Sequence, residues 1–239
     1  MPLAICALAG AACGAHAARQ PRGASASAAA PALRVTSVGR SVRGRRIVAR
    51  VVGDPATVRR VLVVGCTHGD ERAGIAITRS LRAVRPAAGV ALWLVDAFNP
   101  DGCAAHTRQN ANGVDLNRNS PQGWRRLSGA FYSGRAPLSE PESRAIHRLV
   151  TRLRPAITIW YHQHAALVDD SGGDRSIERR YARAVGLPFR RFTRPPGSIT
   201  SWQNAAFPDA TAFVVELPPG RLSGGAVAKH VSAVLALAR

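Results

Sequence analysis

Four short apolar runs recur along this chain, and a polar cluster follows each of them directly. The runs lie at 60–65 (RVLVVG), 90–97 (VALWLVDA), 157–161 (ITIWY) and 212–215 (AFVV). Runs of this length with few polar residues are typical of strands buried on both faces of a sheet. Because helical patterns lie between them, the alternation predicts an α/β sandwich with helices on both faces.

Helical periodicity fills the segments between the predicted strands. An apolar pattern over 75–84 ends at Pro86, and a second helix has its apolar face between Ile146 and Leu153. Its predicted start is SEPE at 139–142, where a serine and a glutamate three residues later have the spacing of a capping box. Two more helices are predicted, around 177–185 and 226–237.

Other stretches carry weaker signals. Apolar residues between Val35 and Val51 suggest early strands, and NPDG at 99–102 is typical of a turn. Residues 103–138 show no clear periodicity, so we expect a long loop there. Loops of that length inside a compact domain are usually functional. Since ligands of open α/β sheets bind at the carboxyl ends of the strands, we expect the polar clusters to gather on one rim.

Charge is the most unusual feature of the composition. The 239 residues fit one large domain, and 33 basic against 14 acidic residues give a net charge of +19. Such a charge attracts polyanions, including an anionic cell-wall surface. The arginines are scattered, however, and no nucleic-acid-binding motif accompanies them, so we expect no specific nucleic-acid partner. No apolar run approaches the ~18 residues of a membrane span, and the sequence leaves the oligomeric state open.

The amino terminus differs from the rest of the chain. Residues 1–30 are mostly small, with an apolar stretch from Leu3 to Cys13 and a small-x-small site at 15–17. This pattern is typical of a signal peptide, although no basic residue precedes the apolar stretch. We expect an exported protein with its folded domain at 31–239, or a cytoplasmic protein if residues 1–30 are a disordered extension. Whether Cys66 and Cys103 pair is left open by the sequence.

Two polar residues in the turn after the first buried run have the spacing of metal ligands. His68 and Glu71 are three residues apart and lie where the turn enters a helix. Two histidines and a glutamate are one of the known ligand sets of catalytic zinc, which needs three protein ligands and one open position. The third ligand should come from another strand end, and His162 directly follows ITIWY.

With these residues in place, the sequence resembles the zinc carboxypeptidase family, and most closely its bacterial murein peptide amidase branch. The resemblance implies a mixed, largely parallel eight-stranded sheet with helices on both faces. It covers residues 60–220, and the matching segments occur in the family's order: GCTHGDE (65–71), NPDG (99–102), RQNANGVDLNRN (108–119), SEPES (139–143), WYH (160–162), PGSITSW (196–202) and VVELPPG (214–220).

The resemblance also implies roles for individual residues. His68, Glu71 and His162 match the ligands of one Zn²⁺ ion, with His164 as the competing third ligand or a substrate-binding residue at the rim. Glu216 matches the general base, and a glutamate after four apolar residues would be expensive to bury without such a role. Three further matches have substrate roles: Arg108 for the oxyanion, and Asn117 with Arg118 for the terminal carboxylate of the substrate.

The chain departs from the family at one position. Digestive carboxypeptidases carry a mobile tyrosine before the catalytic glutamate, but no tyrosine lies between Tyr181 and Glu216. A segment that ends in Ser-Trp occupies this region, as in the amidase branch, and Ser198 and Ser201 could hydrogen-bond a polar substrate side chain.

The resemblance therefore implies a zinc hydrolase that cleaves an amide next to a carboxylate-bearing terminal residue. The expected substrate is a small murein peptide, cut between γ-D-glutamate and a diaminopimelate-type residue. Three alternatives stay open: a general metallocarboxypeptidase, an N-acyl amino acid deacylase, and a non-catalytic basic protein that binds cell wall or nucleic acid.

Overall fold

Eight strands form one mixed sheet at the centre of the molecule. The computed structural model describes residues 1, 33–192 and 195–239, so the signal segment predicted at 1–30 lies outside the described residues apart from Met1. The strands are β1 (Arg34–Arg40), β2 (Arg46–Gly53), β3 (Arg59–Val64), β4 (Val90–Val95), β5 (Ile157–Gln163), β6 (Leu167–Asp169), β7 (Phe189–Arg190) and β8 (Thr211–Leu217).

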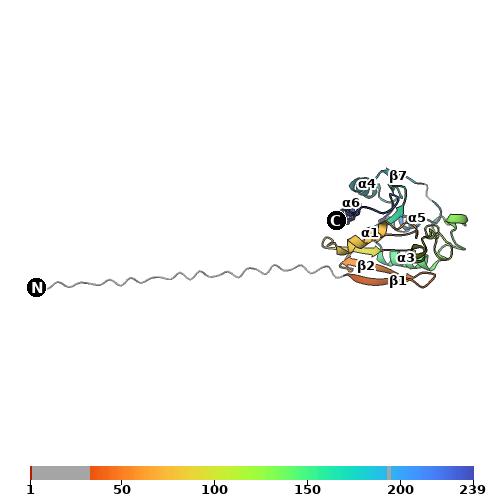
Figure 1. The fold of residues 1–239 in the computed structure, drawn as a ribbon, viewed down its shortest axis with the longest axis horizontal. Coiled ribbons are helices and arrows are strands. Elements are labelled where there is room, and N and C mark those ends of the chain that lie inside the picture. The colour runs from red at the N-terminus through yellow and green to blue at the C-terminus, as the bar shows by residue number, and fades with distance from the viewer. Residues whose placement is uncertain (2–32, 193–194) are drawn as a thin grey trace.

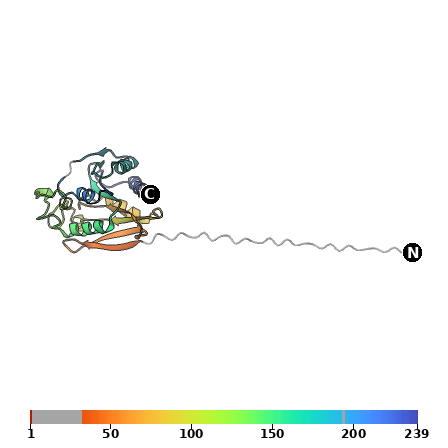
Figure 2. The same cartoon turned by 180° about the vertical axis from the view of Figure 1, so that it is seen from behind.

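The sheet order is β1-β2-β4-β3-β5-β8-β6-β7. Strands β4, β3, β5 and β8 run parallel and form its centre. Antiparallel neighbours flank this block, because β2 pairs with β4 and β6 pairs with β8. Figure 2 shows the hairpin of β1 and β2 (orange) at one margin of the domain.

The described part of the chain contains six α-helices. They are α1 (Gly74–Ser80), α2 (Pro100–Ala105), α3 (Pro141–Leu153), α4 (Arg175–Val185), α5 (Ile199–Ala206) and α6 (Gly224–Ala238). Five of them, all but α2, contribute to the cores on the two faces of the sheet. Figure 1 shows α4 and α6 together, while α3 lies beside the β1–β2 hairpin. Short 3₁₀ turns occur at η1 (Leu81–Ala83), η2 (Leu116–Arg118) and η3 (Gly129–Phe131). No helix in the described part of the chain has both the length and the apolarity to cross a membrane.

The continuous apolar runs are explained by two hydrophobic cores, one on each face of the sheet. Along β3, Val61 and Val63 belong to the core under α1, α4 and α6. Leu62 and Val64 belong to the core under α3 and α5. Because successive side chains of a strand point to opposite faces, a strand covered on both sides has no polar face. Each such buried side chain stabilises the fold by about 1.5–3 kcal/mol.

Two local predictions are wrong. NPDG is not a turn but the start of α2, because Asn99 accepts a hydrogen bond from the Gly102 amide and Pro100 fits the first helical position. The capping box does not form: α3 begins at Pro141, its cap residue is Glu140, and no side chain caps it. The Ser139 hydroxyl donates to Glu140 instead, and Glu142 accepts from the amide of Val42.

The segment predicted as a loop at 103–138 is irregular over most of its length, but it contains the end of α2 and the turns η2 and η3. The short strands β6 and β7 and the helix α5 were not predicted. The remaining helices and the four buried strands lie where the sequence places them.

Candidate metal centre

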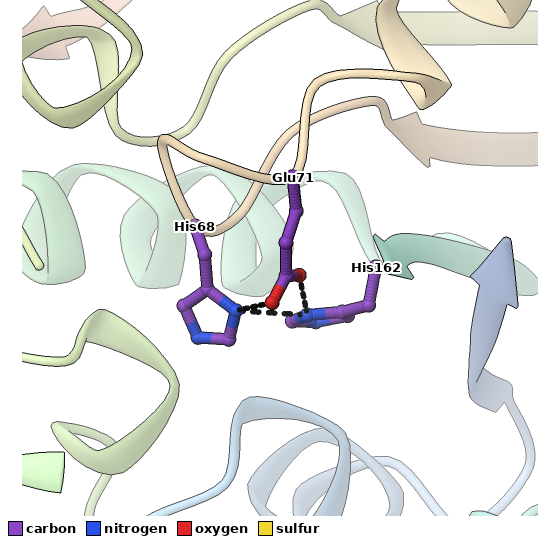
Figure 3. Close-up of side chains that lie close together, drawn as sticks. All are labelled: His68, Glu71 and His162. Atoms are coloured by element: carbon purple, nitrogen blue, oxygen red, sulfur yellow. Dashed lines mark hydrogen bonds and ion pairs between the residues drawn. The ribbon is translucent and has the colours of Figure 1, made fainter. Parts of the chain in front are cut away.

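His68, Glu71 and His162 converge at the carboxyl edge of the sheet. His68 and Glu71 lie in the turn after β3, and His162 lies near the end of β5, the parallel neighbour of β3. The His68 Nδ1 atom is 2.8 Å from Glu71 Oε1, and His162 Nδ1 is 2.8 Å from Glu71 Oε2. The two Nδ1 atoms are 3.2 Å apart (Figure 3). Neighbouring parallel strands thus bring residues 91 or more positions apart into contact.

A buried carboxylate orients His68. The Nε2 atom of His68 is 3.0 Å from Asp115 Oδ1, so its Nδ1 faces Glu71 and His162. Burial lowers the pKa of His68, but Asp115 and Glu71 outweigh burial and raise this pKa to about 9. Burial acts against ionisation of Glu71 too, yet His162 and His68 hold its pKa well below the ordinary value. The carboxylates of this group are therefore charged.

These three residues fit a zinc ion. Their ligand atoms all lie within 4.8 Å of one another, and all three side chains are buried. Two imidazoles and a carboxylate are a zinc donor set, and a carboxylate on the second nitrogen of a histidine is the usual support for a ligating imidazole. His164, the competing third ligand, is exposed and lines a different cavity with Arg72 and Gly220.

Glu216 lies beside this group because of strand register. On the parallel pair β5 and β8, Glu216 is the direct partner of His162. Directly paired residues point to the same face of a sheet, and both side chains line one cavity of about 240 Å³. Burial and the charge of Glu71 raise the pKa of Glu216, while His162 and His68 act in the opposite direction. A carboxyl group with a raised pKa is suited to exchange protons.

Arg108 lies at the mouth of the same cavity. Its guanidinium donates to Asp115 Oδ2 from Nε at 3.0 Å and from Nη2 at 2.8 Å. A third nitrogen, Nη1, lies 3.3 Å from Glu71 Oε1. The side chain is 23% exposed, so its outer edge is accessible from the cavity.

Asn117 and Arg118 lie in η2, directly after Asp115. Asp115 begins this turn by accepting a hydrogen bond from the Asn117 amide. The Asn117 Oδ1 atom accepts from the Ile199 amide at 3.1 Å, which ties the turn to α5. Burial lowers the pKa of Arg118, although a guanidinium stays charged at neutral pH. Both side chains line the cavity that contains His68, Glu71 and His162.

Ser198 and Ser201 lie at the start of α5 on another wall of this cavity. Ser198 caps the helix by accepting a hydrogen bond from the Ser201 amide. The preceding Gly197 has a φ of +71°, and a Cβ there would lie 2.2 Å from the carbonyl oxygen of Arg118. Glycine at this position lets α5 and the 118 turn approach each other closely.

Comparison with known proteins decides which family this is. A model of the zinc carboxypeptidase family matches residues 24–168, more than half of the chain. The chain belongs to the zinc carboxypeptidase family. Murein peptide amidase A of Vibrio campbellii is 32% identical over 223 residues, which cover 84% of this chain and 86% of the relative.

Solved structures of zinc carboxypeptidases share the fold. The murein-tripeptide amidase MpaA of Escherichia coli O157 has a TM-score of 0.70 at 29% identity, with 86% of this chain and 91% of that chain covered. Carboxypeptidase A of Helicoverpa armigera has a TM-score of 0.71 at 19% identity and covers 86% of this chain and 68% of its own, a likeness of fold alone. The predicted fold class, family and hydrolytic enzyme class are confirmed.

Sequence reasoning missed two residues on the wall of the zinc carboxypeptidase cavity. Asp169 ends β6, and Ser171 follows it in the next turn; both are buried. The sequence signal for this strand is LVDD at 167–170, an apolar pair followed by two acids, and a pattern this short does not identify a strand.

The two cysteines left open by the sequence are free thiols, both buried. The Cys66 thiol donates to the carbonyl oxygen of His68 at 3.1 Å, and the neighbouring Cys103 and burial raise the pKa of the Cys66 thiol. Cys66 therefore packs against the turn that carries His68 and Glu71.

Proposed function

We propose that this zinc carboxypeptidase cleaves the amide bond between γ-D-glutamate and a diaminopimelate-type residue in murein peptides. The observation that carries the hydrolytic part is the single cavity in which His68, Glu71 and His162 lie beside Glu216 and Arg118. The murein part is supported by two relatives, one named murein peptide amidase A and one murein-tripeptide amidase.

His68, Glu71 and His162 would hold the zinc ion, which would polarise the scissile carbonyl and lower the pKa of a water molecule. Asp115 keeps the Nε2 proton of His68, so the Nδ1 lone pair is available to the metal. Glu71 adds one negative charge to this donor set.

Glu216 acts as the general base. Its carboxylate takes a proton from the attacking water and passes it to the leaving amine. Glu216 is the direct strand partner of His162, so its side chain lies next to that proposed zinc ligand in the same cavity. The raised pKa brings its proton affinity closer to neutral pH, where a base that later acts as an acid is most effective.

Two arginines would stabilise negative charges of the substrate. Arg108 points its accessible edge into the cavity and would stabilise the negative charge that develops on the carbonyl oxygen. Arg118, with Asn117, would bind the terminal carboxylate, because a planar guanidinium forms two parallel hydrogen bonds with a carboxylate. A fixed carboxylate site next to the metal restricts cleavage to the last residue of a peptide.

The deciding experiment compares substrates. Zinc-loaded protein should hydrolyse L-Ala-γ-D-Glu-meso-diaminopimelate faster than a hippuryl peptide or an N-acetyl amino acid. Faster hydrolysis of the hippuryl peptide would favour a general carboxypeptidase, and faster release of acetate would favour a deacylase.

A variant tests the proposed base. Glu216→Gln should lower kcat for the murein tripeptide roughly 10²- to 10⁴-fold, because the amide side chain cannot take the proton. Zinc content by atomic absorption should stay at one ion per chain. An unchanged kcat would remove Glu216 from the mechanism and favour a non-catalytic binding protein.

We also propose that the protein is exported, on the support of its amino-terminal segment. Fractionation of expressing cells, with sequencing of the mature amino terminus, tests this. A chain that keeps residues 1–30 and stays in the cytoplasm would contradict it.

A further inference from the structure

Asp169 is a buried carboxylate at the far wall of the cavity that contains the metal ligands. It ends β6, which pairs with β8 so that Leu167 lies opposite Glu216 and Val168 opposite Val215. The residue is 8% exposed and lines the cavity together with Arg118. Because the two strands are antiparallel, Asp169 lies two residues away from the position opposite Glu216, toward the amino end of β8.

Among the residues that the structure describes, the charge of Asp169 has no cationic partner. Its Oδ1 accepts from the Phe192 amide at 2.8 Å, and its Oδ2 accepts from the Ser171 hydroxyl at 2.7 Å. Both donors are neutral. Within residues 33–192 and 195–239, no basic side chain forms an ion pair with it, whereas the adjacent Asp170 pairs with Arg175 at 3.1 Å. An ionised carboxylate has about four acceptor sites, so unused capacity remains.

The buried Glu178 on α4 lies in the negative field of Asp169 and Asp170. Burial raises its pKa to about 8, and the charges of Asp170 and Asp169 act in the same direction, so this carboxyl group is neutral at pH 7. A buried negative charge without a partner is costly, so this wall of the cavity favours a cation.

The two sides of the cavity differ in charge. Arg108 contacts Glu71 and Asp115 next to β3, whereas Asp169 lies on β6, beyond β5 and β8 in the sheet. Arg118 lines the same cavity, and Ser198, Thr200 and Ser201 line it with hydroxyl groups at the start of α5. A terminal residue whose carboxylate binds Arg118 would therefore extend its side chain past hydroxyl groups toward a carboxylate. A large apolar side chain would leave that carboxylate buried without a partner.

We propose that Asp169 accepts a hydrogen bond from an ammonium group on the side chain of the leaving residue. The inference rests on the proposed function and assigns Asp169 as the residue that selects a diamino acid at the end of the peptide. Diaminopimelate and lysine both carry such an ammonium group, and they differ in the second carboxylate of diaminopimelate.

The test uses one acyl part and three leaving residues. The substrates are L-Ala-γ-D-Glu-X, with X as meso-diaminopimelate, lysine or 2-aminopimelate, which keeps the distal carboxylate but lacks the side-chain amine. Wild-type zinc enzyme should prefer diaminopimelate to 2-aminopimelate by roughly 10- to 100-fold in kcat/KM, the range of a hydrogen bond between charged groups. The lysine substrate separates the need for the ammonium from any need for the second carboxylate.

Asp169→Asn should remove most of this preference by slowing the diaminopimelate and lysine substrates while the 2-aminopimelate substrate changes little. Asp170→Asn is the matched control, because Asp170 is adjacent and equally buried but already paired with Arg175; its preference should equal that of the wild type. Because preference is a ratio within one preparation, partial misfolding does not alter it. An unchanged ratio in Asp169→Asn, or no preference in the wild type, would overturn the proposal.

Two further measurements keep the test independent of the variant and of the murein assignment. Calorimetric titration of the wild-type zinc protein with free meso-diaminopimelate, lysine and norleucine should rank both diamino acids above norleucine; equal affinities would refute the role of Asp169. If hippuryl peptides are cleaved and γ-D-glutamyl peptides are not, the murein proposal fails, and hippuryl-lysine against hippuryl-norleucine still measures the preference for an ammonium group.

Discussion

Two groups of buried carboxylates lie in this molecule, one beside the ends of β3 and β5 and one at β6 and the start of α4, and they are balanced in opposite ways. Glu71 and Asp115 are surrounded by two imidazoles and Arg108, and the pKa of each carboxyl lies well below its ordinary value. Glu178, next to Asp169 and Asp170, has its pKa raised to about 8. Burial raises the pKa in both groups, so neighbouring cations decide the difference.

The contrast teaches that buried carboxyl groups of one protein can differ in ionisation state, because their neighbours differ in charge. Glu71 and Asp115 of the first group are ionised in the folded protein, which suits a metal cation that stays bound. The second group has too few cations of its own among the described residues, which suits a cation that arrives with the substrate. The following predictions test that division.

The largest effect is expected when the first group loses an imidazole. His162→Ala removes one of three metal donors and leaves Glu71 with fewer positive neighbours, so we expect loss of stoichiometric zinc and of detectable hydrolysis. Zinc content by atomic absorption and kcat on the murein tripeptide are the measurements. His164→Ala should retain zinc; the reverse result for the two histidines would make His164 the third ligand.

A smaller effect is expected from the carboxylate behind the ligands. Asp115→Asn keeps the shape of the side chain but weakens its hold on His68 Nε2, so zinc affinity should fall roughly 10- to 100-fold. Competition with a fluorescent chelator measures this. Asp169→Asn is the counterpart from the second group and should leave zinc affinity unchanged; a comparable loss there would erase the division between the groups.

The sequence predicts the first group much better than the second. The short apolar runs identify β3, β5 and β8, and the resemblance to the zinc carboxypeptidase family assigns His68, Glu71, His162 and Glu216 near their ends. Asp169 is the last residue of a strand of only three residues, and its place beside β8 depends on antiparallel pairing that no local pattern encodes.

The two local errors have different origins. At SEPE the pattern of a capping box is present, but Glu142 accepts hydrogen bonds from the Val42 amide and from Asn110, residues distant in sequence, so tertiary partners outweigh the local preference. At NPDG the local sequence itself favours a helix start, because Asn99 caps the helix and Pro100 fits its first position. Asp101 then anchors this helix by accepting hydrogen bonds from the Arg43 amide and from Arg45.

The smallest effect expected is on stability, and it tests the second group without any assay of hydrolysis. The pKa of Glu178 rises from an ordinary value of 4.5 to about 8 in the folded protein. Its contribution to stability is then fully present below about pH 4.5 and is lost as the pH rises through 8. Glutamine imitates the protonated acid at every pH.

The free energy of unfolding of Glu178→Gln, relative to the wild type, should therefore increase between pH 5 and pH 9, as measured by urea denaturation at several pH values. The difference between the two proteins cancels the titration of groups that they share. Asp101→Asn should show the opposite pH dependence. Burial raises the pKa of Asp101, but hydrogen bonds from Arg43 and Arg45 outweigh burial and lower it. The contribution of Asp101 to the free energy of unfolding is therefore lost as the pH falls. A flat difference for Glu178→Gln would mean that this carboxyl is already ionised at neutral pH. The second group would then have a cationic partner, and the reason for a cation from the substrate would be lost.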